Sequence, residues 1–486
     1  MLWRGLTMLV ALAATATAAV MVEGVNDTFP ANTTSLRGGE GDSSILFETA
    51  DASPSTGLSP EAWRAQVDRL VSRRLTRLTL QLQKKLREQN EHSTILFSPL
   101  SISGALHLLW LGARGRTATE LGALLGKSLG LTVDDLLPSI RRINTQLEHG
   151  SGGTEIDVAN GLFLQYGYPV RTWFANVSQD TFGTEVYGVE FADKGEAATA
   201  QINGWVSRKT KGRINKFLHS PLPANTKVLI ANAIYFNGEW ENPFPQETSF
   251  LRPYTIPTES GESEVIKLWM MTNSGDLPYA RSEKLNCHVV GLPYKGKQVT
   301  MYLVLPIDRG LEALRILERK LTVMDMEELQ AATNETPVII SVPRMRILST
   351  FHLRETIEQL GVEALFDPVE ADLGLMSPGK QVVSQTFSLD KDNSSSNGLA
   401  VEFPGRTRRA AVVANDNPGL FVDDMIHKVE IEVTETGTVA SAVTALTVTR
   451  DGSRIVLRFD RPFLFFIRHE ATGLQLFWGS VVRPVT

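Results

Sequence analysis

The sequence predicts an α+β protein with a large mixed β-sheet, and three observations support this fold class. Segments with helical periodicity and β-branched, strand-like segments follow one another without regular strand–helix repetition. The 486 residues are 42% hydrophobic and 21% charged, so the chain can bury a large core. Its single cysteine, Cys287, excludes an intrachain disulfide, so packing must hold the fold together. The neighbours of this cysteine in CHVVGLP predict a buried strand position.

Composition and motifs argue against several classes of function. The 48 Lys and Arg residues are outnumbered by 54 Asp and Glu residues, and the net charge of −6 argues against a nucleic-acid-binding protein. One cysteine cannot build a Cys-based zinc site or an iron–sulfur cluster. The sequence has no His-Glu-x-x-His motif, Walker loop or dinucleotide glycine motif, and His469-Glu470 lacks the second histidine. We therefore expect no metal, no cofactor and no enzyme activity.

Residues 1–22 have the three-part layout of a secretory signal peptide. Arg4 precedes an apolar stretch from Leu6, and small residues follow around Ala18. A signal anchor that stays in the membrane is the alternative, but the apolar core is short for a membrane span. We expect the mature protein to be secreted, without a membrane span. Five glycosylation sequons agree with this compartment: Asn26, Asn32, Asn176, Asn334 and Asn393.

Residues 23–59 are polar and rich in Gly, Ser and Thr, which predicts a flexible N-terminal extension. From Pro60 to Gln89, apolar residues recur at three- and four-residue spacing and predict a long amphipathic helix. Its basic side chains, Arg73 among them, either bind a polyanion such as a glycosaminoglycan or form the solvated face of the helix, which is the more frequent case. The basic segment VSRKTKGRINK is a second candidate for the same partner.

The next elements are expected in the core. Residues 93–115 begin as an apolar strand and pass through Ser98-Pro99 into a helix that is hydrophobic nearly all round. Further strands are predicted at 155–165, 227–240, 288–306, 337–347 and 425–433, and helices at 195–217 and 353–360. A final pair of strands is predicted within 455–482.

Residues 377–417 interrupt this pattern with KDNSSSNG, PGRTRRAA and NDNPG. Such a stretch within a domain predicts a disordered surface insertion. Its basic cluster from Arg406 to Arg409 is either a processing site or without a role, and we favour the second interpretation.

The stretch from Glu435 to Arg454 is unusual. After Gly437, twelve consecutive residues, from Thr438 to Thr449, carry no charge. A permanent internal strand is one interpretation; a strand waiting to be inserted explains more, because the segment ends at a charged cluster and lies between strands. One face of this strand is small or apolar and suited to enter a core: Thr438, Ala440, Ala442, Thr444, Leu446 and Val448.

Six segments carry a specific family pattern in one order along the chain: ILFSPLSISGALHLLWLGARGRTATEL, KVLIANAIYFNGEWENPF, LPYKGKQVTMYLVLP, VPRMRILSTFHLRETIEQLGVEALFDPVEADLGLM, HKVEIEVTETGTVASAVT and RPFLFFIRHEATGLQLFWGSVVRP. In these segments the chain resembles a serpin, a serine protease inhibitor of the loop-insertion class. Chance does not account for six colinear matches of this length. The resemblance runs from Pro60 to the C-terminus apart from the insertion, and implies a single serpin domain over 60–486.

The resemblance implies a serpin-like α+β fold with a large mixed central β-sheet, further β-sheets and eight to nine helices. It implies an exposed hinge and reactive-centre loop over 435–458. The hinge residues would be Glu435, Gly437, Thr438, Ala440 and Ala442, with Thr436 and Val443 departing slightly from the family's preferences. The residues that control opening of the central sheet would be Ser98, Ser101, Asn232, Trp240 and His427. Of these, Trp240 would lie near the top, where the loop enters.

The mechanism that the resemblance implies is suicide inhibition of a target serine protease by a monomeric protein. The protease cleaves the loop and forms an acyl-enzyme, and the freed part of the loop inserts into the central sheet. The cleaved bond is Asp451–Gly452, which suits an Asp-specific protease, or Arg450–Asp451, which suits a trypsin-like one. Two alternatives are a non-inhibitory serpin that binds or carries a ligand, and a hydrolase with an unrecognised site.

Overall fold

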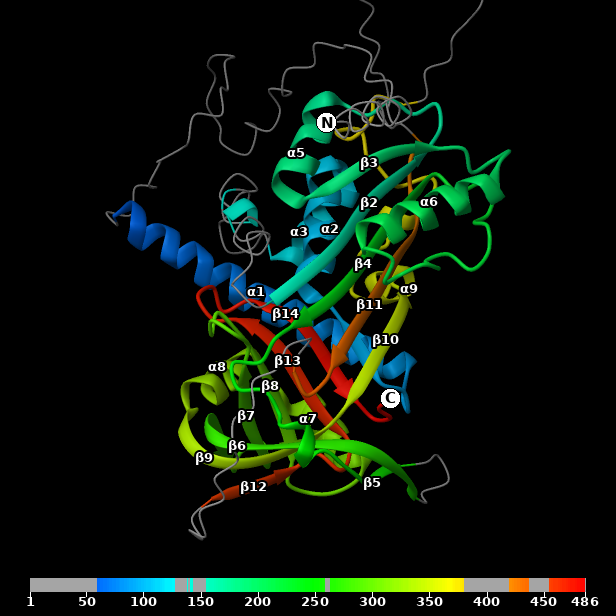
Figure 1. Cartoon of the computed structure of the whole chain (residues 1–486). Helices are drawn as coiled ribbons and strands as arrows, with labels where there is room; N and C mark the ends of the chain where they lie inside the picture. The colour runs from blue at the N-terminus through cyan, green and yellow to red at the C-terminus, as the bar shows by residue number, and fades with distance from the viewer. Residues whose placement is uncertain are drawn as a thin grey trace, which may run out of the picture.

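Two β-sheets and the helices around them make up the fold (Figure 1). The computed structural model describes residues 59–126, 138, 140–142, 154–257, 263–379, 419–436 and 454–485. The expected signal peptide, nearly all of the N-terminal extension and most of the expected insertion lie outside these residues. Ser377, which we expected at the start of the insertion, is buried, and its amide donates to the carbonyl oxygen of Leu373 at 3.2 Å. The boundary at 377 was therefore set too early.

The long amphipathic helix is confirmed to the residue as α1, Pro60–Gln89 (Figure 1). Ser59 caps it by accepting a hydrogen bond from the amide of Ala62, and Pro60 opens the first turn, where its missing N–H costs nothing. Helix α2, Pro99–Gly112, begins in the same way after Ser98, whose side chain accepts from the amide of Ser101. It is buried among other elements, as its all-round apolar surface predicts.

The described residues contain eight α-helices, in agreement with the expected eight to nine. Those after α2 are α3 (Gly115–Leu125), α5 (Thr172–Phe182), α6 (Gly195–Lys209), α7 (Leu311–Lys320), α8 (Val323–Ala331) and α9 (Arg354–Gln359). The helix predicted over 195–217 was too long. It ends at Lys209 because Lys211 and Gly212 take positive φ angles of 48° and 79°, which a right-handed helix does not allow.

The smaller sheet has five strands in the order β10-β11-β4-β2-β3. Their bounds are β2 (Thr154–Gln165), β3 (Thr184–Val189), β4 (Val228–Gly238), β10 (Met345–His352) and β11 (Val422–Val433). The β4–β11 and β2–β3 pairs are parallel, whereas β2–β4 and β10–β11 are antiparallel. The sheet is therefore mixed, as predicted.

The larger sheet has nine strands in the order β1-β14-β13-β8-β7-β6-β9-β12, with β5 paired to β6. Their bounds are β1 (Ile95–Phe97), β5 (Phe250–Pro257), β6 (Ser263–Ser282), β7 (Cys287–Pro293), β8 (Val299–Pro306), β9 (Asn334–Pro343), β12 (Ile455–Arg458), β13 (Phe463–His469) and β14 (Gln475–Val481). The predicted final pair of strands was wrong, because 455–482 contains three strands. Cys287 is buried at the start of β7 as predicted, and burial raises the pKa of its thiol to about 12.

Helix α6 covers one face of the five-stranded sheet (Figure 1). Its Trp205 packs edge-on against Phe163 of β2, with ring centroids 5.3 Å apart. This approach requires Gly161 in β2, because a Cβ atom there would lie only 2.7 Å from both rings. The helix therefore lies directly over β2 and β4.

The opposite face of the sheet packs on α2 and on the nine-stranded sheet. Ile230 of β4 belongs to the same buried cluster as Ile102 of α2. Further along β4, Phe236 contacts Phe477 of β14 with centroids 5.1 Å apart. With α6 on one side and this core on the other, every residue of β4 is buried.

Candidate functional site: the β4–β11 pair and its hinge

Strands β4 and β11 lie side by side at the centre of the five-stranded sheet and run in the same direction (Figure 1). Eight consecutive residue pairs are in register, and among them His427 of β11 stands opposite Asn232 of β4. A strand that entered between two parallel strands from the end of β11 would be antiparallel to both. The directions of β4 and β11 are therefore compatible with an antiparallel strand between them.

A buried polar cluster joins the two strands on the face that packs on α2. The amide of Ser98 donates to Nε2 of His427 at 2.9 Å, and Nδ1 of His427 lies 2.5 Å from Oδ1 of Asn232. Nδ2 of Asn232 donates to Ser101 and, at 2.5 Å, to Oδ1 of Asn160 in β2. Three strands and the start of α2 are thus tied together through one amide side chain.

These contacts fix the protonation state of His427. Because its Nε2 accepts from a backbone amide, the ring proton must be on Nδ1, which donates to the side-chain oxygen of Asn232. The side chain is fully buried, and burial lowers the pKa of His427 to about 3. The imidazole is therefore neutral at physiological pH, and a second proton on Nε2 would break the contact with Ser98.

We expect acid to destabilise the folded protein partly through this histidine. Its folded pKa lies below the ordinary value, so stability is fully present above pH 6.5 and is lost as the pH falls towards 3. Each pH unit in this window costs about 1.4 kcal/mol for a buried histidine that stays neutral. His107, whose pKa burial lowers to about 4, adds to the same loss.

Urea unfolding at pH 7, 6, 5 and 4 measures this dependence. His427→Gln should give a shallower loss of stability with falling pH than the unchanged protein. His219→Gln is the matched control, since His219 is exposed. Equal pH slopes for all three proteins would contradict the assignment.

The hinge end of the site lies beyond the C-terminus of β11. Nε1 of Trp240 donates to the carbonyl oxygen of Thr434 at 2.9 Å. The main-chain amide of Trp240 donates to the carbonyl oxygen of Thr436 at 3.3 Å. The indole ring stacks on Tyr294, the residue after β7, with ring centroids 4.5 Å apart. Trp240 therefore positions the first residues after β11 over the end of β4.

Glu435 adds side-chain contacts at the same place. Its carboxylate accepts from Oγ of Ser249 at 3.0 Å and lies 3.9 Å from Nη1 of Arg344. Its carbonyl oxygen accepts from the amide of Phe244 at 2.7 Å. The chain is thus held by both side-chain and main-chain contacts where it leaves the sheet.

The structure brings Ser98, Ser101, Asn232 and His427 together, as the resemblance implies. Trp240 lies apart from them, roughly 26 Å along β4 at about 3.3 Å per residue, near the hinge. Asn160 is part of the cluster and was missed; its signal is a polar residue within the apolar run of β2. The remaining predicted site residues lie outside the described residues: Gly437, Thr438, Ala440, Ala442, Arg450, Asp451 and Gly452.

The far end of the predicted loop returns to the other sheet. β12 pairs in parallel with β9 at the edge of the nine-stranded sheet, with Ile455 opposite Val338. Residues 437–453 therefore connect a central strand of one sheet to an edge strand of the other.

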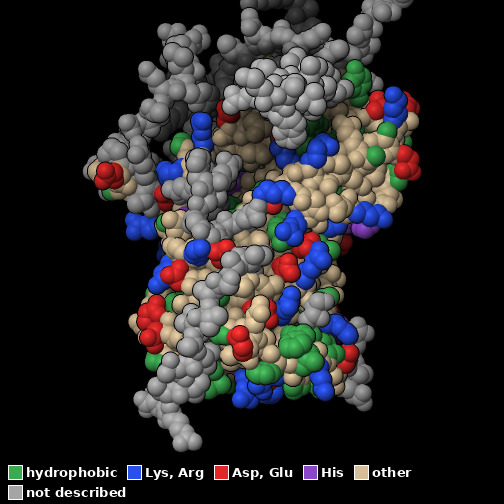
Figure 2. All heavy atoms as spheres, in the orientation of Figure 1, with side chains coloured by type: hydrophobic (Ala, Val, Ile, Leu, Met, Phe, Trp, Pro, Cys, Tyr) green, Lys and Arg blue, Asp and Glu red, His purple; other side chains and the backbone are tan. Residues whose placement is uncertain are grey.

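The two basic segments are partly neutralised by ion pairs. Arg73 of α1 pairs with Glu327 at 2.6 Å, and Lys211 pairs with Asp157 at 2.9 Å. On the face drawn in Figure 2, basic and acidic side chains of the described residues are interspersed. These contacts favour the solvated-face interpretation, and binding of a glycosaminoglycan stays a prediction.

Two of the five sequon asparagines lie among the described residues. Asn176 on α5 and Asn334 at the start of β9 are both exposed, so a glycan could be attached to either. Asn26, Asn32 and Asn393 lie outside these residues. Within the described part of the chain, no helix has the length and apolarity to span a bilayer. Nor do His, Cys, Asp and Glu side chains there form a group of three suited to a metal ion.

Comparisons with known proteins agree with this architecture. A family model described as serpin (serine protease inhibitor) matches residues 73–484. The chain is 30% identical over 416 residues to the leukocyte elastase inhibitor of Homo sapiens, an alignment that covers 84% of this chain and 98% of that protein. It is 29% identical over 418 residues to serine protease inhibitor 28Dc of Drosophila melanogaster, an alignment that covers 80% of this chain and 76% of that protein. The crystal structure of uncleaved ovalbumin matches with a TM-score of 0.70 at 21% sequence identity. This match covers 85% of this chain and 100% of the ovalbumin chain.

The fold and the site define an α+β protein in which a long segment leaves a central strand of a mixed sheet. The chain belongs to the serpin family. The resemblance and the fold class predicted from the sequence are confirmed. Relatives of this chain carry the names of serine protease inhibitors.

Proposed function

We propose that this protein is a secreted inhibitor of a serine protease that traps its target by loop insertion and is not itself an enzyme. The observation that carries the proposal is the direct, parallel pairing of β4 with β11. Strand β11 has 12 residues and β4 has 11, and the uncharged segment from Thr438 to Thr449 matches them in length. Cleavage of the loop would free this segment to enter between the two strands.

Hydrogen bonding supplies a driving force for insertion. The inserted strand would replace the single β4–β11 ladder with two ladders, a net gain of about a dozen residues of pairing. At ~0.5–1.5 kcal/mol net per hydrogen bond, this gain is on the order of 10 kcal/mol. Both new pairings would be antiparallel, which is slightly more stable per residue than the parallel pairing they replace.

The test is incubation of the full chain with trypsin, elastase, subtilisin and an Asp-specific protease. We expect at least one protease to give an SDS-resistant covalent complex. We also expect the loop-cleaved protein to melt at a higher temperature than the intact protein. Cleavage without either result would contradict inhibition and favour a member of the family that binds or carries a ligand.

A second experiment identifies the bond that the protease cleaves. Mass spectrometry of the released C-terminal fragment should show a start at Asp451 with a trypsin-like target, or at Gly452 with an Asp-specific one. In the first case Arg450→Ala should slow complex formation by roughly 100-fold or more, because the buried carboxylate of such a pocket loses its partner. Asp451→Ala is the matched variant for the second case. Cleavage confined to 406–409 would contradict both assignments.

Secretion is part of the same proposal. The layout of residues 1–22 and the exposure of Asn176 and Asn334 support it. When the full chain is expressed in cells with a secretory pathway, we expect the medium to contain protein that lacks residues 1–22 and shifts in mass after glycosidase treatment. Retention of an unprocessed chain inside the cells would contradict secretion.

A further inference from the structure

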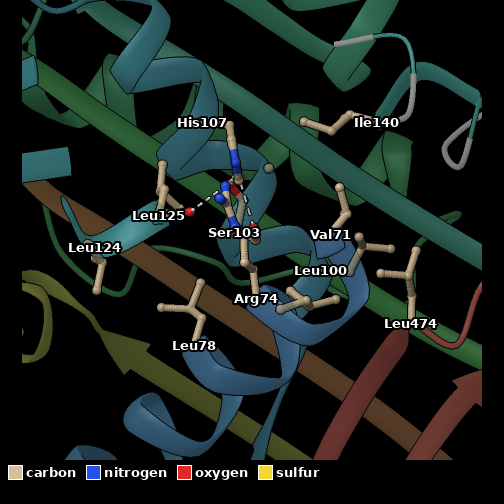
Figure 3. A pocket seen from close by; sticks show the side chains of 12 residues that line it. Val71, Arg74, Leu78, Leu100, Ser103, His107, Leu124, Leu125, Ile140 and Leu474 are labelled. Carbon is tan, nitrogen blue, oxygen red and sulfur yellow. Dashed lines mark hydrogen bonds between the residues drawn. The ribbon is translucent and has the colours of Figure 1, made fainter. Parts of the chain in front are cut away.

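A cavity lies between α1, α2 and α3, and none of the residues that line it belongs to β4 or β11 (Figure 3). Most of its wall is aliphatic: Val71, Leu75, Leu78, Leu100, Leu124 and Leu474. The cavity has a volume of about 50 Å³, and it opens to solvent at its mouth. Such a wall favours an apolar occupant.

One charged side chain projects into this aliphatic cavity. Arg74 rises from α1, and its guanidinium lies between the C-terminal end of α3 and His107 of α2 (Figure 3). Its Nη1 makes a long contact of 3.5 Å with the carbonyl oxygen of Leu125. Its Nε and Nη2 are buried and have no hydrogen-bond partner among the described residues.

The two unpartnered nitrogens are a matched pair of donors. Nε and Nη2 lie on the same edge of the guanidinium, and their N–H bonds are parallel, which is the geometry that binds both oxygens of a carboxylate. Burial lowers the pKa of Arg74, and no carboxylate of the described residues offsets this effect. A buried donor pair without a partner is costly, so an anion at this edge would stabilise the protein.

The polar side chains nearest to Arg74 do not supply that anion. His107 is buried, and burial lowers its pKa to about 4, so it is neutral. Its Nδ1 lies 2.7 Å from the carbonyl oxygen of Ser103 and is therefore the protonated ring nitrogen. The cavity thus combines a single positive charge with neutral and aliphatic walls.

We propose that this cavity binds a straight-chain aliphatic carboxylate, with its head group on the Nε–Nη2 edge of Arg74 and its hydrocarbon chain along the leucines. The carboxylate forms two charge-assisted hydrogen bonds in a site of low dielectric. The hydrocarbon chain of the ligand leaves water and buries its apolar surface against the leucines, which favours binding. This site is independent of protease inhibition, so either proposal can fail without the other.

The test is calorimetric titration of the full-length protein with sodium octanoate and, separately, with 1-octanol. We expect octanoate to bind and 1-octanol, which has the same chain without the charge, to bind at least tenfold more weakly. Arg74→Gln should weaken octanoate at least tenfold. Arg74→Lys keeps the charge but not the paired donors. Its affinity for octanoate should lie between that of the unchanged protein and that of Arg74→Gln.

Two further variants keep the test decisive. Arg73→Gln is the matched control, because Arg73 is the neighbouring arginine but is exposed and paired with Glu327; its octanoate affinity should be unchanged. Val71→Phe adds a ring to the wall one turn before Arg74 and should block octanoate even if Arg74→Gln does not fold. Equal binding of octanoate and 1-octanol, unchanged binding in Arg74→Gln, or no binding at millimolar octanoate would overturn the proposal.

Discussion

Thr438→Arg is expected to convert the proposed inhibitor into an ordinary substrate, which the protease cleaves and then releases. Thr438 is the first of the uncharged residues after the hinge, and its face of the strand would have to enter the core between β4 and β11. Burial of an unpaired charge there costs several kcal/mol. The barrier to insertion then rises at its first step, and hydrolysis of the acyl-enzyme competes with trapping. We expect the covalent complex to fall by at least about tenfold while cleavage of the loop continues.

The measurement is the molar ratio of serpin to protease needed for complete inhibition, with the cleaved product followed on gels. Thr438→Ser is the matched control, since it keeps a small, uncharged side chain at the same position. It should retain most of the inhibition. Full trapping by Thr438→Arg would contradict loop insertion from this hinge.

Local signals account for the elements that the sequence predicts well. α1 has its leucines at helical spacing, a Ser-Pro start and an Asn at its end, so both the element and its bounds are predictable. β4 is buried on both faces and therefore shows a continuous apolar run. In both elements the residues themselves carry the information.

The elements that were missed or misplaced depend on long-range contacts. β6 has 20 residues with many polar ones, because much of it is exposed, so it lacks an apolar pattern. The predicted strand 337–347 is divided at Arg344, and its two parts, β9 and β10, belong to different sheets. Nothing in the residues themselves indicates which partner each part will find.

The same reasoning applies to the polar cluster. Four of its members could be named from the resemblance. Asn160 could not, because its role follows from the register that places Asn160, Asn232 and His427 in one row across β2, β4 and β11. Such a row is a property of strand pairing between segments more than 70 and 190 residues apart.

Asn232→Ala should lower the stability of the intact protein much more than that of the loop-cleaved protein. The amide of Asn232 accepts from His427 and donates to Ser101 and Asn160. Its removal leaves the buried Nδ1–H of His427 without an acceptor, at a cost of about 1–3 kcal/mol, and adds the cost of a small cavity. An inserted strand would lie between Asn232 and His427 and separate them in any case. The loss should therefore fall mainly on the form in which β4 and β11 are paired.

Urea unfolding of both forms measures this difference. Asn237→Ala is the matched control on the same strand, because Asn237 is buried but its side-chain oxygen has no partner among the described residues. Asn237→Ala should lower the free energy of unfolding of both forms by the same small amount. Equal losses for intact and cleaved Asn232→Ala would mean that the cluster only packs the core. A selective loss would mean that His427 and Asn232 hold the two strands together until cleavage, so that the stability of this contact sets how readily the sheet opens.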